Sequence, residues 1–150
     1  MDFAFNKFAT SGYQLLDKYQ AGLVLTGAEV KSTRQNGLSL RQAYVSVNYS
    51  PKPEFYLMKA KISPYRFAPR TDHYDPEKPR KLLLQKAEMR TLLGKLEQKG
   101  LTIIPLRVYN NRNFIKVEIA LAKGKKQFEK KEDLKKKAVD KEIRTRLKYQ

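Results

Sequence analysis

Apolar and polar residues alternate with a period of two along several short stretches of this 150-residue chain. From residue 115 to 121 apolar side chains at the odd positions alternate with Lys116, Glu118 and Ala120, and residues 43–47 repeat the pattern. Successive side chains of a strand point to opposite faces of a sheet, so this period is typical of strands with one face in a core and one in water. The body of the chain is therefore expected to be mainly β.

Four further stretches are rich in strand-forming residues. Tyr13–Tyr19 is expected to be the first strand, and residues 23–25, 55–58 and 102–109 are short apolar or β-branched runs. Pro105 has no N–H and indicates an edge or a bulge in the last of them. About six short strands favour a small closed or nearly closed barrel, because closure removes exposed sheet edges.

Helical periodicity is clear in one place. Met89, Leu92, Leu93 and Leu96 recur at the spacing of one helix face, and Gly100 follows as a C-terminal stop. A second, short helical turn is compatible with the residues after Ser32. We therefore expect one or two helices packed on the barrel.

The stretch from Ile62 to Arg80 contains four prolines and several basic residues. Proline removes backbone donors, so no regular element of any length is expected here. A long, proline-stiffened basic loop is more often functional than a simple connection.

Charge restricts the partners of this chain. It has 32 Lys and Arg against 15 Asp and Glu, a formal net charge of +17. Such an excess costs stability through self-repulsion and favours a polyanionic partner, nucleic acid above all, because neutralised phosphates release counterions. An anionic membrane surface is the alternative, but there is no apolar run of about 18 residues and the N-terminus does not resemble a signal peptide. With no cysteine, neither a disulfide nor a thiolate metal site is expected. We expect a soluble, cytoplasmic protein without a cofactor.

The last thirty residues differ in composition from the rest. Residues 121–150 contain twelve basic and five acidic side chains and little apolar material. We expect a folded body over residues 1–122 and a basic tail over residues 123–150. The pairs Glu132–Lys136 and Asp133–Lys137 support a helix, so the tail is expected to be disordered when free and helical against a polyanion. The alternative is a tail that only keeps the protein in solution.

Catalysis has little support in the sequence. His73 is the one histidine, and no glycine-rich phosphate loop is present. Glu29 and Lys31 are expected on alternate positions of one strand, where such a pair is more often a salt bridge or a positioning pair than an acid–base couple. A nuclease hypothesis would rest on Glu29, Asp75 and His73 alone. We expect that the protein is not an enzyme.

Five short blocks are specific in combination. They are, in order, Asn6-Lys7-Phe8-Ala9, residues 21–32 (AGLVLTGAEVKS), Ile62-Ser63-Pro64-Tyr65, residues 75–84 (DPEKPRKLLL) and residues 121–126 (LAKGKK). Together they resemble the small protein B family, which binds transfer-messenger RNA, over roughly residues 6–148. Each block alone is weak, but five collinear blocks are strong. A structural ribosomal protein or a general RNA chaperone has the same composition but does not account for these blocks.

The resemblance implies an antiparallel barrel of the oligonucleotide-binding (OB) type with flanking helices and a long C-terminal tail. It implies binding to the tRNA-like part of transfer-messenger RNA, and delivery as a monomer with a translation elongation factor and GTP to stalled ribosomes. The body would replace the missing anticodon arm. The tail would pass the decoding centre into the empty messenger channel, where it would become helical.

The resemblance also implies sites. The expected RNA-binding residues are Asn6, Lys7, Gln20, Glu29, Lys31, Arg34, Arg41, Arg80, Lys81, Leu83, Lys123, Lys125 and Lys126. The lysines and arginines would contact phosphates, which position RNA without reading its sequence. Leu83 would pack on an exposed base, although a core leucine explains the sequence equally well. The residues expected in the decoding centre and messenger channel are Phe128, Glu129, Lys130, Lys131, Lys135, Lys136, Lys137, Lys141, Ile143, Arg144 and Leu147.

Three positions depart from the family pattern. Gln20 replaces an acidic residue, which puts its role in RNA binding in doubt, and Phe8 replaces a basic one. Residues 129–131 read Glu-Lys-Lys instead of Asp-Lys-Arg, and Lys lacks the two-pronged geometry of Arg. Phe128 stands where the family has Tyr or His, and its ring is expected to stack on a base of the decoding centre.

Overall fold

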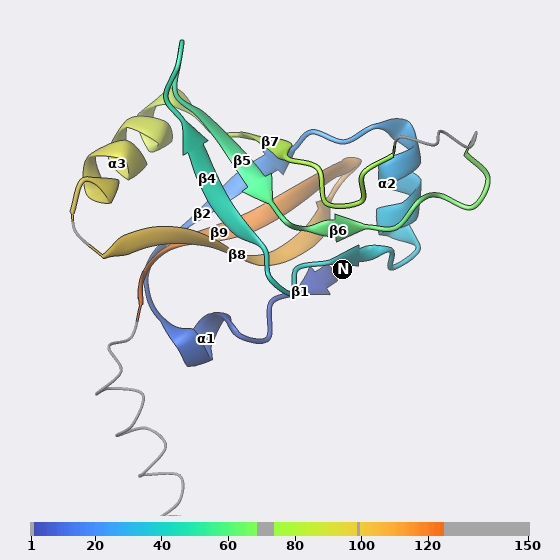
Figure 1. Cartoon of the computed structure of the whole chain (residues 1–150), viewed down its shortest axis with the longest axis horizontal. Helices are drawn as coiled ribbons and strands as arrows, with labels where there is room; N and C mark the ends of the chain where they lie inside the picture. The colour runs from blue at the N-terminus through green and yellow to red at the C-terminus, as the bar shows by residue number, and fades with distance from the viewer. Residues whose placement is uncertain (1, 69–73, 99, 125–150) are drawn as a thin grey trace, which may run out of the picture.

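The computed structural model describes residues 2–68, 74–98 and 100–124 (Figure 1). Its strands are β1 (Asp2–Phe5), β2 (Tyr13–Leu23), β3 (Leu38–Ser39), β4 (Tyr44–Asn48), β5 (Glu54–Met58), β6 (Lys61–Ile62), β7 (Arg80–Leu83), β8 (Leu101–Asn111) and β9 (Phe114–Gly124). Its helices are α1 (Ala9–Gly12), α2 (Gly27–Arg34) and α3 (Lys86–Leu96). Strands dominate, as the alternation predicts.

The main sheet closes into a barrel. Its strands follow the order β1-β8-β4-β5-β7-β2-β9, and β9 pairs in turn with β8. Six strands therefore form a ring, β1 pairs with β8 along the same edge as β4, and β3 pairs separately with β6. Every pair of neighbours is antiparallel. The expected small antiparallel barrel is confirmed.

The inward-facing residues of the ring form one core. Val117, Ile119 and Leu121 of β9 are fully buried together with Phe55 and Leu57 of β5. Each large apolar side chain that leaves water in this way stabilises the fold by about 1.5–3 kcal/mol. The alternation between residues 115 and 121 therefore corresponds to the inward and outward faces of β9.

A bulge bends β8 at Pro105. The pairing of β8 with β9 shifts register between Pro105 and Arg107, as the missing N–H of proline predicts. At its far end β9 closes against the start of β2, where Gly124 pairs with Tyr13. The last described residue of the C-terminal stretch is thus held by the barrel.

Helix α3 agrees with the expectation and α2 does not. Leu92 of α3 is fully buried against the barrel, and Gly100 has a φ of 87°, which favours glycine. Residues 27–34 form a helix, so the expectation that Glu29 and Lys31 lie on a strand is wrong. The physical reason is local: the Thr26 hydroxyl accepts from the Glu29 N–H at 3.2 Å, and the Glu29 carboxylate accepts from the Thr26 N–H at 3.0 Å. This capping box starts a helix where apolar runs suggested a strand.

Two further expectations about strands are corrected. The first strand is β1, not residues 13–19, and residues 13–23 form one continuous strand, so 23–25 is not a separate one. Short strands such as β3 and β6 raise the count above six. Between β6 and β7 the described residues form no helix or strand, in agreement with their prolines. The tail from residue 125 onward lies outside the described residues, and the division at residue 122 remains a prediction.

Candidate nucleic-acid interface

One outward surface of the barrel brings together side chains that lie far apart in the sequence. Strand pairing places Leu83 opposite Gly22, Gln20 opposite Glu118, and Glu118 opposite Arg107. We define the outer face as the outward residues of β7, β2, β9 and β8 in this region: Lys81, Leu83, Gln20, Lys116, Glu118, Arg107 and Tyr109. It contains three of the residues expected to bind RNA.

Gln20 lies at the centre of a hydrogen-bonded network on the outer face. Its amide N–H donates to Glu118 Oε2 at 3.1 Å, and the Tyr109 hydroxyl donates to its carbonyl oxygen. Arg107 approaches the same Glu118 oxygen at 3.4 Å and pairs with Asp2 at 2.7 Å. The Asp2 carboxylate, opposed by partial desolvation, raises the pKa of Arg107. Both ends of the Gln20 amide are therefore engaged, and the carboxylate of this surface comes from Glu118.

Leu83 is an exposed residue and not part of the core. Its side chain is 55% accessible and lies over Gly22, where an added Cβ would approach within 3.4 Å of the Leu83 Cβ. The structure thus excludes the core alternative. Beside it, Lys81 is exposed and its ammonium lies 3.5 Å from the Glu54 carboxylate. An apolar side chain next to a cation suits contact with a base and its phosphate.

Arg80 is not available as a phosphate contact, and that expectation is wrong. Both Arg80 and Glu29 are 2% exposed, and the guanidinium pairs with the carboxylate at 2.7 Å. The other guanidinium N–H groups donate to the carbonyl oxygens of Ala60 at 2.7 Å and Pro76 at 2.9 Å. Arg80 therefore joins α2, β5–β6 and the basic loop inside the molecule.

The same cluster keeps Glu29 ionised. Burial alone would raise the pKa of Glu29, but the Thr26 N–H and the Arg80 guanidinium outweigh it and lower this pKa below its ordinary value. Tyr74 adds a hydroxyl that donates to Ile62 O at 2.9 Å. Glu29 is thus a buried structural anion that is not available for direct RNA contact. Its ion pair is with Arg80, and not with Lys31 as expected.

Asn6 donates hydrogen bonds to the backbone of β8. Its amide N–H donates to Pro105 O at 2.9 Å, and its main-chain N–H donates to Leu106 O at 2.8 Å. Along this edge of β8, β1 pairs with Arg107 and residues beyond it, whereas β4 pairs with Ile103. Asn6 therefore fills the gap between the two neighbours of β8, at the bulge. Lys7 follows it as an exposed cation.

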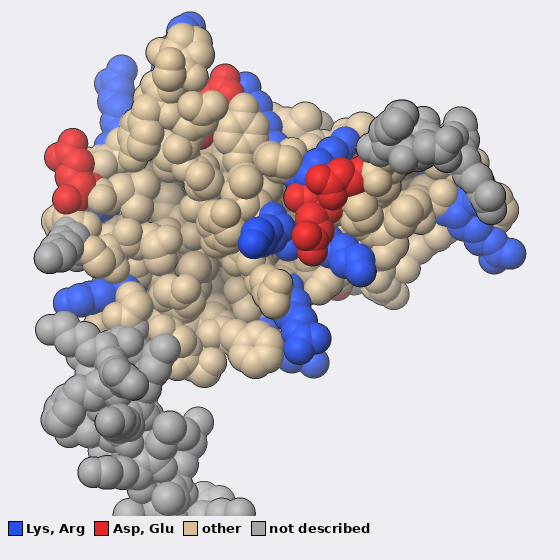
Figure 2. Space-filling model, viewed as in Figure 1, with Lys and Arg blue, Asp and Glu red and all other residues tan. Residues whose placement is uncertain are grey.

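The remaining expected cations are not among the residues of the outer face. Lys31 and Arg34 lie in the last turn of α2, with Lys31 placed 5.5 Å from the Tyr65 ring centre and Arg34 donating to Asn110 Oδ1 at 3.3 Å. Arg41, in the turn before β4, and Lys123, near the end of β9, are exposed. Figure 2 shows lysine and arginine in separate groups on the visible face, with wide areas of uncharged side chains between them. The cations on this face therefore do not form one basic patch.

The structure offers little for catalysis. No group of three or more His, Asp or Glu side chains within the described residues could hold a metal ion. Glu29 is paired with Arg80 inside the protein, and His73 lies outside the described residues. Of the three residues on which the nuclease hypothesis rests, only Asp75 is left within the described residues. Among the described helices none is long and apolar enough to cross a membrane.

Part of the expected site lies outside the described residues. Lys125, Lys126 and the tail set from Phe128 to Leu147 lie outside the described residues. The residues expected to bind RNA do not include Arg107, Tyr109 and Glu118, although the alternation already placed Glu118 on the wet face of its strand. The bulge at Pro105 moves Arg107 into register with Glu118. Pro105 predicts an irregularity in this strand, but it does not predict which residues of the neighbouring strand then lie opposite each other.

Comparison with known proteins identifies the family. The family model described as SmpB protein matches residues 3–149. The SsrA-binding protein of Pseudothermotoga lettingae is 47% identical over 138 residues, which are 91% of this chain and 90% of that protein. The SsrA-binding protein of Sulfurihydrogenibium sp. is 48% identical over 140 residues, 93% of this chain and 90% of that protein. A chain from the solved structure "tmRNA-SmpB: a journey to the center of the bacterial ribosome" is 42% identical, with a TM-score of 0.64, over 82% of this chain and 84% of that chain. This chain therefore belongs to the SmpB protein family.

Proposed function

We propose that this protein binds the tRNA-like domain of transfer-messenger RNA and delivers it to stalled ribosomes for trans-translation, the rescue and tagging of stalled translation products. The observation that carries the proposal is the match to the SmpB family from residue 3 to residue 149. Relatives named SsrA-binding proteins and a solved tmRNA-SmpB structure associated with the ribosome support it. In this role the protein is an RNA-binding protein and not an enzyme.

The outer face suits the RNA-binding step. Exposed Leu83 provides an apolar surface for a base, and Lys81, Lys116 and Arg107 around it provide cations for phosphates. Glu118 and the Gln20 amide hold Arg107 and Tyr109 in one arrangement before RNA arrives. A preformed surface loses less side-chain entropy on binding than a mobile one.

In this proposal the tail makes the contacts with the ribosome. Its lysines would follow the phosphates of the decoding centre and the empty messenger channel, with Phe128 stacking on a base. We further propose that the protein acts as a cytoplasmic monomer and travels with transfer-messenger RNA, a translation elongation factor and GTP. The net charge of +17 favours an RNA partner at every step.

Two linked measurements test the proposal. RNA that co-purifies with the tagged full-length chain from cells is expected to be enriched in transfer-messenger RNA. Its affinity is expected to fall about a thousandfold from 50 to 200 mM salt if about six phosphates are contacted. Enrichment of ribosomal RNA in its place, or a flat salt response, would contradict the proposal.

Truncation separates the two steps. A chain ending at Gly124 keeps every described strand and is expected to retain binding to transfer-messenger RNA while losing peptide tagging. A full-length chain with Lys125, Lys126, Lys130 and Lys131 changed to Ala provides the matched control of unchanged length. Tagging by the truncated chain at the full-length rate would exclude the messenger-channel role of the tail.

A further inference from the structure

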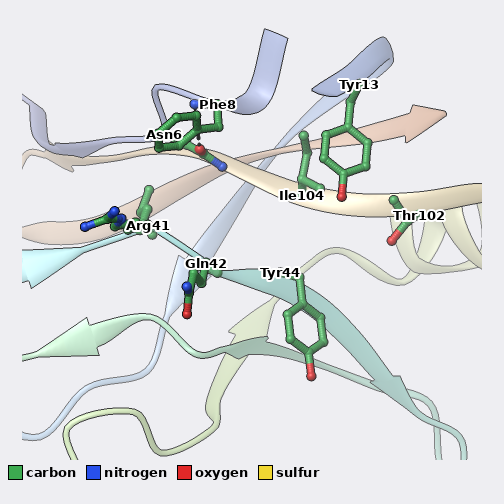
Figure 3. Close-up of a pocket in the computed structure, with 10 residues that line it drawn as sticks. Asn6, Phe8, Tyr13, Arg41, Gln42, Tyr44, Thr102 and Ile104 are labelled. Carbon is green, nitrogen blue, oxygen red and sulfur yellow. Dashed lines mark hydrogen bonds between the residues drawn. The ribbon is translucent and has the colours of Figure 1, made fainter. Parts of the chain in front are cut away.

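A hollow of about 570 Å³ opens beside the root of the tail. It lies between the turn after β1, the start of β2, the N-terminal half of β8 and the residues leading into β4 (Figure 3). This volume is within the range of small-molecule sites, about 300–1,000 Å³. Two of its lining residues, Asn6 and Arg41, are among those expected to contact RNA, but no ligand is assigned to the hollow itself.

The hollow combines an apolar floor with aromatic walls. Leu40 and Ile104 form part of the floor and are almost fully buried. Phe8, Tyr13 and Tyr44 line the hollow from three separate parts of the chain, and Figure 3 shows their rings apart from one another. Phe8 is 61% and Tyr44 40% exposed. Covering these rings with a ligand would remove apolar surface from water, which is favourable. Grouped exposed aromatic side chains are typical of a binding surface.

The position of Phe8 is fixed before any ligand binds. Its main-chain N–H donates to Asn6 Oδ1 at 3.1 Å, drawn as the dashed line in Figure 3. The other end of the Asn6 amide is held by Pro105 O at 2.9 Å. The bulge of β8 therefore determines where the Phe8 backbone lies, through a single side-chain amide.

Two polar side chains at the rim of the hollow have no partner within the described residues. The side chains of Arg41 and Gln42 are exposed and have no hydrogen-bond or ion-pair partner in the part of the chain that the structure describes. A guanidinium pairs well with phosphate, and a primary amide offers one donor group and one acceptor to a base edge. The hollow thus presents stacking, edge recognition and a phosphate partner together.

We propose that this hollow receives one nucleobase that has turned out of its stack in the RNA partner. Phe8 and Tyr44 provide aromatic surfaces for stacking, Gln42 meets the base edge, and Arg41 neutralises the adjoining phosphate. The inference rests on the proposed function, because it takes the partner to be RNA. The overall positive charge favours this occupant over an apolar peptide, and unpaired RNA bases are recognised by stacking on such rings.

Ring-removing variants test the hollow. Phe8→Leu, Tyr44→Leu and the double variant keep apolar volume but remove the stacking surface. Phe114→Leu is the matched control, since Phe114 is 71% exposed and does not line the hollow. Thermal melting of each full-length variant verifies folding. Base reactivity is probed chemically in transfer-messenger RNA with the protein alone, and in ribosomal RNA of stalled ribosomes that contain both.

The expected result is one base whose protection depends on Phe8 and Tyr44 but not on Phe114. The RNA in which it appears identifies its source. Affinity for that RNA should fall about 5- to 150-fold, with an unchanged salt slope because no phosphate contact is lost. If wild type binds RNA and no base in either RNA responds, the inference is overturned and the proposed function stands. If wild type does not bind transfer-messenger RNA, the proposed function fails and the inference with it.

Discussion

Two arginines of this barrel each bind a carboxylate next to a tyrosine, yet their surroundings differ. Arg80 is buried with Glu29 and Tyr74, and its remaining N–H groups reach main-chain carbonyls. Arg107 is partly exposed between Asp2 and Glu118, with its guanidinium 4.3 Å from the Tyr109 ring centre. The same chemical groups hold the interior together in one region and face solvent in the other.

The difference shows that burial, and not residue type, decides which cation is free to meet a phosphate. A buried guanidinium has no exposed N–H left to offer, and removal from its carboxylate would leave two charges without water. An exposed one keeps solvent access and can exchange one anion for another at little cost. The contrast can be tested by disrupting each region in turn.

The largest effect is expected from Arg80→Met. This change leaves the Glu29 charge buried without its main partner and should lower the free energy of unfolding by about 3–5 kcal/mol. Chemical denaturation monitored by circular dichroism measures it. A loss below about 1 kcal/mol would mean that the cluster is not buried in solution as described.

A smaller effect that depends on pH is expected from Glu29→Gln. At neutral pH the loss of charge should cost about 1.5–3 kcal/mol, since the amide keeps the shape and Arg80 keeps its carbonyl partners. The pKa of Glu29 is lowered in the folded chain, so the contribution of its charge is fully present above the ordinary value of 4.5. It is lost as pH falls through the lower folded pKa.

The difference in stability between wild type and Glu29→Gln should therefore be constant above about pH 5 and narrow in more acidic solution. Denaturation at a series of pH values checks this directly. A difference that widens as the pH falls would contradict the sign of the pKa change.

The smallest effect on stability is expected from Arg107→Ala, about 0.2–1 kcal/mol, because both of its ion pairs face water. Its effect on RNA should be distinct: the salt slope of binding to transfer-messenger RNA should decrease by about one unit if Arg107 contacts a phosphate. Binding measured at several salt concentrations decides this. An unchanged slope would remove Arg107 from the interface while leaving its structural assignment intact.

Local patterns predicted much of the fold. The alternation at residues 115–121, the spacing of Met89, Leu92 and Leu96, and the irregularity at Pro105 each depend on the nearest turns of the chain. Such features are determined by residues that stand together in the sequence. The family resemblance then gave the type of barrel.

Long-range pairing explains what could not be predicted. The interior role of Arg80 requires Glu29, 51 positions away, and the role of Asn6 requires Pro105, 99 positions away. The start of α2 was missed because its capping box competes with an apolar run that favours a strand. Phe8, Tyr13 and Tyr44 come to line one hollow only after the ring of strands has closed.

The pairing of Gly124 with Tyr13 has a mechanical consequence. It gives the tail a fixed point of attachment, so its length becomes a measure of distance from the barrel. The 26 residues from 125 to 150 span about 39 Å as a continuous helix and at most about 90 Å fully extended. A binding surface within that radius meets these residues at a raised local concentration. The final pair of the sheet thus fixes the point on the barrel from which the residues after Gly124 start.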